Sequence, residues 1–393
     1  MKILMLSDVY FPRVNGVSTS IQTFRRELRE LGHEIWLVAP QYGQPTADER
    51  GIDRVRSHQV LFDPEDRMMH PRVLARRLAI LQTWKFDLVH VQTPFIAHYA
   101  GLRLARRMGM PCVETYHTFF EEYLFHYLPI LPKRAWRAVA RQLSRRQCNQ
   151  LDGLVVPSRA MFDALIHYGV RTRMRVIPTG IPADALPEGD GAAFRARHGI
   201  RPDQPALVFV GRVAFEKNIE FLLRVTHELQ RTTHPQVVLI IAGEGPAKNR
   251  LRRLGRSLGL EANLRFVDYL ARGADLSSCY QAGDVFVFAS RTETQGLVLL
   301  EAMSLGVPVV STAVMGTRDI LAAERGALIA EEDIPQFATQ VRRLLDDAEL
   351  RRRSGEEGRA YAGQWTARGP AQALLAFYQD LRDERSRAPS RTA

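Results

Sequence analysis

The sequence predicts an α/β protein with two doubly wound domains, each built on a parallel sheet. Short apolar runs alternate with helical patterns over residues 3–177, and a second series begins at residue 207. A polar stretch rich in proline and glycine, residues 178–205, separates the two series and predicts an interdomain linker. Such alternation is typical of parallel strands joined by crossover helices, and 393 residues are enough for two hydrophobic cores.

The first series of apolar runs predicts the sheet of the N-terminal domain. Each run is short enough for one buried strand and is followed by a segment with helical spacing. The predicted strands are residues 3–6, 34–38, 88–91, 112–115, 154–156 and 175–177.

The second series predicts the C-terminal sheet, after which helical patterns continue toward the end of the chain. Residues 365–370 include a glycine and a proline, which break the helical pattern before the final helix. The predicted strands are residues 207–210, 237–242, 264–267, 285–288 and 307–310, and the later helices are residues 334–345, 349–361 and 371–381.

These elements imply a division into two domains. We expect an N-terminal domain of residues 1–180, joined by the final helix within about residues 366–385, and a C-terminal domain of residues 181–365. The polar tail, residues 386–393, is expected to be disordered. Because ligands bind outside the carboxyl ends of the strands in open parallel sheets, two such domains facing one another would form an interdomain cleft.

Composition limits the cellular setting and the partners. A formal charge of +11 calls for an anionic partner, such as nucleic acid, a membrane surface or a phosphorylated ligand. No apolar run approaches the ~18 residues of a transmembrane helix, and the first run is too short for a signal peptide. We therefore expect a cytoplasmic protein. Cys112, Cys148 and Cys279 are unclustered, which predicts buried thiols rather than disulfides or a zinc site.

Two glutamates, Glu293 and Glu301, flank the turn after the strand at residues 285–288. If one helix carried both, they would lie roughly 12 Å apart, too far for a shared metal or a tight dyad. The start of this helix would suit an anion, which Gly296 would allow to approach closely. An anion flanked by hydroxyl-rich groups, a sugar and a ribose, fits this arrangement. On spacing alone, a capping acid and a solvated helix residue fit equally well.

Other glycines and cations lie after predicted strands. Arg212 and Lys217 share one short loop, where a diphosphate could bind arginine in bidentate fashion and lysine as a point charge. Glu216 could position Lys217 or offset its charge. Gly245 lies in a Gly-Glu-Gly-Pro turn that also fits an ordinary helix entry. Gly16 follows Asn15 in a turn where Ser18 or Thr19 could cap the next helix, and where a phosphate or sugar could bind.

His117 ends a predicted strand and precedes an aromatic cluster that includes Tyr123 and His126. The cluster is compatible with a hydrophobic acceptor mouth or with core packing.

The segment that follows this cluster is basic and amphipathic. Its cations include Arg134, Arg137, Arg141 and Arg145, and its apolar stripe is Trp136, Val139 and Leu143.

A basic amphipathic helix of this kind could lie on an anionic bilayer, where each cation near the surface contributes about 1 kcal/mol to the free energy of membrane binding. The alternative is a helix docked on its own domain with a solvated basic face. Further arginines in the same half favour the membrane: Arg72, Arg76, Arg77, Arg103, Arg106 and Arg107.

Taken together, these motifs resemble those of the retaining glycosyltransferases of family 4, which have the GT-B architecture of two facing Rossmann-like domains. The resemblance covers nearly the whole chain. It is most specific in Gly-Arg-x4-Lys over residues 211–217 and in the Glu-x7-Glu of Glu293 and Glu301. Thr-Glu-Thr-Gln-Gly at residues 292–296 and His-Thr-x-x-Glu-x-Tyr-x-x-His-Tyr at residues 117–127 resemble the subgroup that glucosylates diacylglycerol. The commoner family pattern has Gly-Phe-Gly at residues 294–296.

The resemblance also implies roles for individual residues. Gly16 would contact the donor phosphate, and Arg212 and Lys217 would neutralise the diphosphate of a sugar nucleotide. Glu301 would accept hydrogen bonds from the ribose hydroxyls, while Glu293 and His117 would contact the transferred sugar. The family is read as reacting on the front face of the sugar, so no nucleophile is assigned. The sequence has no Asp-x-Asp, so neither a metal nor another cofactor is expected.

The leading hypothesis is therefore transfer of a hexose, glucose from UDP-glucose, to a membrane lipid such as diacylglycerol. The enzyme would be retaining, metal-independent and peripherally attached to the inner face of the cell membrane. One alternative is the same chemistry on a polysaccharide or lipopolysaccharide acceptor, and another is a sugar-nucleotide epimerase of the same fold. Nucleic acid is not expected as a partner, because no nucleic-acid motif is present.

Overall fold

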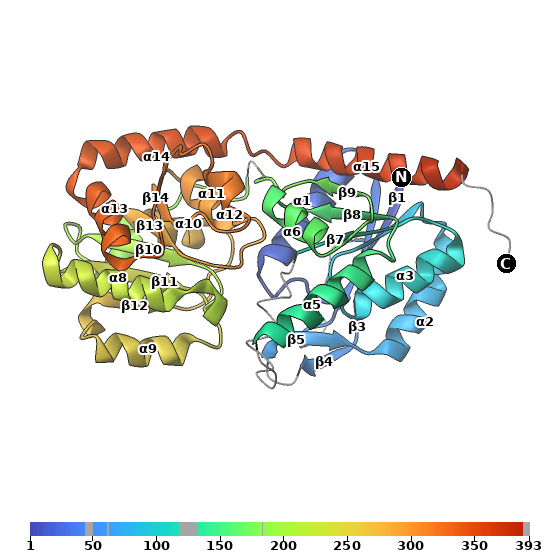
Figure 1. Ribbon diagram of the computed structural model, residues 1–393, viewed down its shortest axis with the longest axis horizontal. Helices are drawn as coiled ribbons and strands as arrows, with labels where there is room; N and C mark the ends of the chain where they lie inside the picture. The colour runs from blue at the N-terminus through green and yellow to red at the C-terminus, as the bar shows by residue number, and fades with distance from the viewer. Residues whose placement is uncertain (44–49, 61–62, 118–132, 183, 388–393) are drawn as a thin grey trace. The chain divides into compact units, whose positions relative to one another are not determined.

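The computed structural model describes residues 1–43, 50–60, 63–117, 133–182 and 184–387 (Figure 1). The chain divides into two compact units. Unit 1 is Met1–Gly180 with Ala367–Ala393, and unit 2 is Ile181–Thr366. The last helix continues to Arg387, so the first two residues of the predicted disordered tail are helical. Residues 388–393 lie outside the described residues.

Unit 1 contains a doubly wound parallel sheet. Its described strands follow the order β3-β2-β1-β6-β7-β8-β9, and all neighbours pair in parallel. All of the strands predicted for this half are confirmed; β3 was not predicted, because its sequence Ile-Asp-Arg-Val has no apolar run. The strands are β1 (Lys2–Leu6), β2 (Glu34–Pro40), β3 (Ile52–Val55), β6 (Leu88–Val91), β7 (Cys112–Thr115), β8 (Gly153–Val156) and β9 (Met174–Val176).

Helices cover both faces of this sheet (Figure 1). Ile3 and Met5 of β1 belong to one core with residues of α1 and α15. On the other face α3 approaches so closely that a Cβ at Gly101 would lie 2.6 Å from a methyl of Val91. A hairpin of β4 (Ser57–Val60) and β5 (Asp63–Met69) forms a separate two-stranded antiparallel sheet. The helices are α1 (Gly16–Glu30), α2 (Pro71–Leu81), α3 (Ile96–Met108), α5 (Lys133–Cys148), α6 (Arg159–His167) and α15 (Arg368–Arg387).

The final helix α15 is part of the core of unit 1. Phe377 and Leu381 pack over Gly153, where an added Cβ would lie 2.5 Å from the Leu381 side chain. The Tyr378 hydroxyl is 2.5 Å from Nδ1 of His90, and Nε2 of His90 is 2.8 Å from the Thr115 hydroxyl. Every polar atom of this buried imidazole therefore has a partner, which offsets the cost of burying it.

Burial lowers the pKa of His90 to about 3, with a smaller contribution from His117. The unfolded chain binds a proton near pH 6.5, so the unit should lose stability as the pH falls below 6.5, by up to about 1.4 kcal/mol per pH unit. His90→Gln should make this dependence shallower. Urea unfolding followed by the fluorescence of Trp36 and Trp84 would measure it, and equal pH slopes in the two proteins would contradict the assignment.

Unit 2 repeats the doubly wound plan. Its described strands follow the order β12-β11-β10-β13-β14-β15, again all parallel. The predicted strands are confirmed, and the short edge strand β15 was not predicted. The strands are β10 (Ala206–Val210), β11 (Val238–Ala242), β12 (Leu264–Val267), β13 (Val285–Phe288), β14 (Val309–Ser311) and β15 (Ala327–Ile329).

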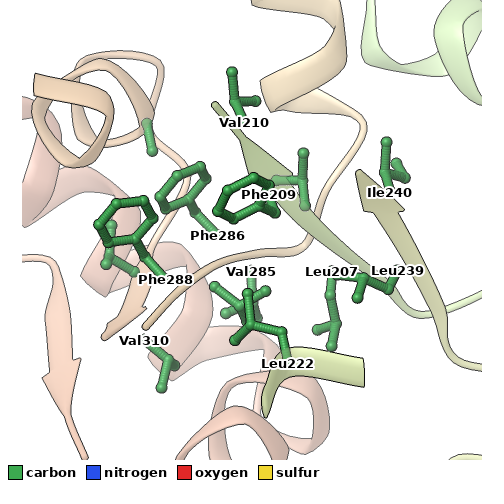
Figure 2. Packing of buried hydrophobic residues seen from close by; sticks show 14 of the residues in the cluster. Leu207, Phe209, Val210, Leu222, Leu239, Ile240, Val285, Phe286, Phe288 and Val310 are labelled. Carbon is green, nitrogen blue, oxygen red and sulfur yellow. The ribbon is translucent and has the colours of Figure 1, made fainter. Parts of the chain in front are cut away.

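The core of unit 2 is built from the central strands and the helices that cover them (Figure 2). Phe209 and Phe288 have stacked rings, with centroids 5.9 Å apart and planes at 11°. The helices predicted after residue 330 are confirmed. The helices are α7 (Gly191–Arg197), α8 (Ile219–Thr232), α9 (Lys248–Ser257), α10 (Ala274–Gln281), α11 (Leu297–Ser304), α12 (Thr317–Leu321), α13 (Ile334–Asp346) and α14 (Ala348–Ala362).

The prediction that residues 178–205 form a plain linker was wrong. They contain helix α7, whose Phe194 is buried in the core of unit 2. The entry to α7 lies directly on the backbone of α10, because a Cβ at Gly191 would lie 2.3 Å from the Gln281 carbonyl oxygen. The glycines that suggested a flexible connection therefore permit close packing.

Candidate active site

The loops that follow β10 and β11 lie side by side at the carboxyl edge of the unit 2 sheet. The Val213 amide donates to the Glu244 carbonyl at 2.8 Å, and the Ala247 amide donates to the Val213 carbonyl at 3.0 Å. Gly245 has φ +154°, and a Cβ there would lie 2.4 Å from the Val213 carbonyl oxygen. This predicted donor-binding glycine is thus required for the contact between the two loops.

The loop after β10 brings Lys217 to the loop after β13. Lys217, at the end of a short 3-10 turn (Phe215–Lys217), forms an ion pair with Glu293. Both side chains are mostly buried, at 19% and 17% exposure. The Arg212 guanidinium is 3.9 Å from the Glu216 carboxylate. The partner expected for Lys217 was Glu216; the structure instead places Glu216 beside Arg212 and gives Lys217 to Glu293.

Glu293 and Glu301 do not share one helix. Helix α11 begins at Leu297, and Gly296 precedes it in the left-handed region at φ 97°. Glu293 therefore lies in the loop, where its carbonyl accepts from the Gly316 amide at 2.9 Å. A Cβ at Gly316 would lie 2.0 Å from the Thr294 carbonyl, so this loop is held closely against the one after β14. The separation of roughly 12 Å, which was expected if one helix carried both Glu293 and Glu301, therefore does not apply.

Glu301 is a buried acid held on both oxygens. Arg272 pairs with Oε1 at 2.9 Å, and the Tyr280 hydroxyl donates to Oε2 at 2.8 Å. Burial, with the neighbouring Glu301 carboxylate, raises the pKa of Tyr280 well above its usual value, so the hydroxyl stays protonated and donates. A solvated helix acid is thereby excluded. Sequence reasoning missed Arg272 and Tyr280, which belong to no motif near the glutamates.

Removing the Glu301 carboxylate should destabilise unit 2. Glu301→Ala leaves the Arg272 guanidinium and the Tyr280 hydroxyl without this partner in a buried site, which costs about 3 kcal/mol. Urea unfolding followed by the fluorescence of Trp365, which lies in this unit, measures the loss. Glu349→Ala, which breaks an exposed pair with Arg352 on α14, should leave the transition unchanged. Equal stability of the two variants would contradict a stabilising role for the contacts of Glu301 with Arg272 and Tyr280.

In unit 1 the predicted phosphate contact, Gly16, is the first residue of α1. The Asn15 side chain caps this helix by accepting from the Ser18 amide at 2.8 Å. The expectation that Ser18 or Thr19 is the cap was wrong, since both lie inside the first turn. Nothing lies within 4 Å of a Cβ built on Gly16, so the space beside this helix end is open within the described part of the chain.

His117 lies just beyond β7, next to the residues that follow β6. Its Nε2 is 3.2 Å from the Gln92 amide oxygen. Burial lowers the pKa of His117 to about 4, so the imidazole is neutral at neutral pH. A neutral imidazole has one nitrogen that donates a hydrogen bond and one that accepts. Asp8, after β1, accepts from the Thr93 hydroxyl at 2.8 Å and from the Ala97 amide at 3.0 Å. Sequence reasoning missed Asp8, Gln92 and Thr93.

The predicted acceptor residues are only partly described. Tyr123 and His126 lie outside the described residues, as does the side chain of Trp136. Helix α5 docks on its own unit, which is one of the two alternatives proposed, and Leu143 of the predicted apolar stripe is partly buried there. Val139 of that stripe is 48% exposed. The buried positions are Ala140, Ser144, Gln147 and Cys148.

Most of the arginines singled out on α2, α3 and α5 lie on the surface of unit 1. Arg141 and Arg145 of α5 are exposed, and Arg137 is partly buried. The arginines of α2 and α3 named above are all exposed. No helix in the described part of the chain has both the length and the apolar character needed to cross a membrane.

Comparison with known proteins assigns both units. A family model described as Glycosyltransferase Family 4 matches residues 14–185, and one described as Glycosyl transferases group 1 matches residues 190–361. The alpha-monoglucosyldiacylglycerol synthase of Streptococcus pneumoniae is 30% identical over 327 residues, covering 79% of this chain and 71% of that protein. The sulfoquinovosyl transferase SQD2 of Arabidopsis thaliana is 31% identical over 365 residues, covering 89% and 67%.

The fold has solved counterparts. Anabaena HepE in complex with UDP-glucose matches with a TM-score of 0.76 at 17% identity, covering 97% of this chain and all of that one. Two Rossmann-like units, the second with acids and cations in the loops that follow its strands, together with the two family matches, define a hexosyltransferase with the GT-B fold. The chain belongs to the glycosyltransferases of family 4, as the motif resemblance predicted, and the diacylglycerol glucosyltransferases are among its relatives.

Proposed function

We propose that this enzyme transfers glucose from UDP-glucose to diacylglycerol, with retention of the anomeric configuration. The observation that carries the proposal is the loop cluster of unit 2, in which Lys217 pairs with Glu293 while Glu301 is fixed separately by Arg272. Glu293 is proposed to face the sugar and Glu301 the ribose, so that Lys217 would meet the diphosphate that joins these two parts of a sugar nucleotide. The glucosyldiacylglycerol named for the streptococcal relative supports the lipid acceptor.

The pairing of Glu293 supports a front-face reaction. A double displacement needs a free carboxylate beneath the anomeric carbon, whereas the Glu293 carboxylate is already bound to the Lys217 ammonium. In the front-face step, the bond from the anomeric carbon to the diphosphate oxygen breaks. The acceptor hydroxyl oxygen bonds to that carbon on the same face, and its proton passes to the leaving diphosphate. Arg212 and Lys217 would stabilise the charge that develops on the diphosphate.

The proposed setting is the inner face of the cell membrane. Exposed arginines on α2, α3 and α5 give unit 1 a basic surface that suits anionic lipids. Because Arg212, Lys217 and the helix start at Leu297 can meet the diphosphate, we propose that no metal ion is required. Activity unchanged by a chelator would support this, and activity restored only by a divalent cation would contradict it.

One assay tests the proposal as a whole. The full chain is incubated with a panel of labelled sugar nucleotides and with vesicles that contain diacylglycerol, and products are identified by mass spectrometry. We expect glucosyldiacylglycerol from UDP-glucose, with an α-linkage by NMR. Transfer only to added saccharide acceptors would replace the lipid with a polymer acceptor. Turnover of the sugar nucleotide without any acceptor would indicate an epimerase.

A further inference from the structure

Both side chains that hold Glu301 come from one short segment around helix α10. Arg272 lies two residues before Ala274, the first residue of this helix, and Tyr280 lies near its end. Arg272 pairs with Oε1 of Glu301 at 2.9 Å, and the Tyr280 hydroxyl donates to Oε2 at 2.8 Å. Each of them therefore occupies one oxygen of the acid that is proposed to bind the ribose.

The segment just before α7 fixes the position of α10. The Asp190 amide donates to the Ser278 hydroxyl at 2.8 Å. A Cβ at Gly189 would lie 2.3 Å from the Ser278 amide nitrogen, so the two backbones are in direct contact. The Tyr280 ring is fully buried and packs against Phe286 of β13, with ring centroids 5.6 Å apart. The Tyr280 hydroxyl therefore has little freedom to move.

The two contacts leave part of the Glu301 carboxylate available to a ligand. An ionised carboxylate offers about four lone-pair positions, which are divided between its two oxygens. Arg272 and Tyr280 occupy one position on each oxygen, and no further ion pair or hydrogen bond reaches this carboxylate from the described residues. Acceptor capacity therefore remains on both oxygens. Two neighbouring hydroxyl groups, such as those of a ribose, match this pair of acceptors.

The burial of Glu301 makes a missing hydroxyl costly. The side chain is only 7% exposed, so water has little access to an acceptor that a ligand leaves unpaired. For this reason, sites built to hydrogen-bond a hydroxyl discriminate strongly against analogues that lack it. A carboxylate that is free to turn about its last side-chain bond would discriminate less, because it could reorient toward another donor. Arg272 and Tyr280 restrict this rotation, since each of them holds one oxygen.

We propose that Arg272 and Tyr280 are positioning residues that make the site selective for a ribonucleoside diphosphate over its 2′-deoxy analogue. They act through Glu301, because they direct its remaining lone pairs at the 2′- and 3′-hydroxyls of the ribose. A sugar nucleotide built on deoxyribose would leave one buried acceptor without a donor. The inference deepens the proposed function and rests on it for the assignment of Glu301 to the ribose.

Calorimetric titration of the full chain with UDP and with 2′-deoxy-UDP tests the proposal. The measured quantity is the ratio of the two dissociation constants. The unmodified chain should bind UDP about tenfold or more tightly than 2′-deoxy-UDP, as expected for one hydrogen bond to a charged group. Y280F removes a hydroxyl and little volume, and should reduce this preference to about threefold or less, because the carboxylate can then turn. R272Q removes the charged donor to the other oxygen and should reduce the preference in the same way, which provides the test if Y280F does not fold.

The matched control is Y361F. Tyr361 lies on α14 and is also buried in the core of unit 2, but it is not one of the described partners of Glu301. This variant should keep the preference of the unmodified chain. A purely structural role for Tyr280 would lower the stability of Y280F in urea and leave its preference for UDP unchanged, which would overturn the proposal. Equal affinities of the unmodified chain for the two nucleotides would also overturn it.

The titrations need neither a glucosyl group nor a lipid, so the inference and the proposed function can fail separately. A chain that shows the expected preferences but glucosylates no lipid would refute the proposed function and leave the inference standing. A chain that makes glucosyldiacylglycerol from UDP-glucose, but whose preference for UDP survives both Y280F and R272Q, would refute only the inference.

Discussion

Lys217→Ala is expected to lower kcat/KM by about 10²- to 10³-fold and to weaken binding of the sugar nucleotide. The substitution removes the cation proposed to meet the diphosphate. It also leaves the mostly buried Glu293 carboxylate without its partner, so that a negative charge would face the negative diphosphate. The two effects act in the same direction, which makes this the largest single loss that we expect.

Steady-state kinetics with UDP-glucose and a direct titration of UDP would measure the effect. The matched control is Arg352→Ala, which removes a cation from an exposed ion pair on α14 in the same unit. This control should keep full activity. Thermal unfolding of both variants checks that the lysine variant is folded. A folded Lys217→Ala protein with near-normal turnover would remove the lysine from the diphosphate site.

Glu293→Gln should lower kcat by a similar factor of about 10²- to 10³-fold, but without weakening donor binding. The amide keeps the size of the side chain and loses the charge that is proposed to orient the sugar. Lys217, released from its ion pair, remains available to the diphosphate, so the affinity for UDP should stay the same or increase. The loss in kcat with unchanged donor affinity separates Glu293 from Lys217.

The double variant provides the internal control for both assignments. If Lys217 and Glu293 act as one unit, the combined loss in kcat/KM should be much smaller than the product of the two single losses. Losses that multiply independently would mean that the ion pair has no role in catalysis. A Glu293→Gln protein that is as active as the unmodified chain would remove the acid from the reaction.

Much of the fold could be predicted because the information is local. Buried parallel strands are continuous apolar runs, so β6, β7, β10 and β13 could be placed from sequence alone. Of the strands that were missed, β3 and β15 lie at the edges of the two parallel sheets and need fewer apolar residues, and β4 and β5 form the separate hairpin. The glycines of residues 178–205 suggested a linker because sequence cannot distinguish a flexible glycine from one that permits close packing.

The residues of the candidate site could be singled out for the same reason. Charged residues that follow predicted strands are local features of the sequence, so Arg212, Lys217, Glu293 and Glu301 could be proposed as donor-binding residues. Their partners could not be named. Arg272 lies 29 positions before Glu301 and follows a different strand, and only the packing of that loop onto α11 makes them an ion pair.

The two doubly wound units and the family could be inferred from the sequence, because strand periodicity and loop motifs are properties of neighbouring residues. The pairing of the charges, in contrast, follows from the folded arrangement of the loops. This arrangement pairs Lys217 with Glu293 rather than with the adjacent Glu216. The folded structure also orients α5 so that Ser144 and Gln147, which are hydrogen-bonded, are buried and Val139 is exposed. These outcomes depend on contacts between segments far apart in the chain, where each buried polar group must find a partner.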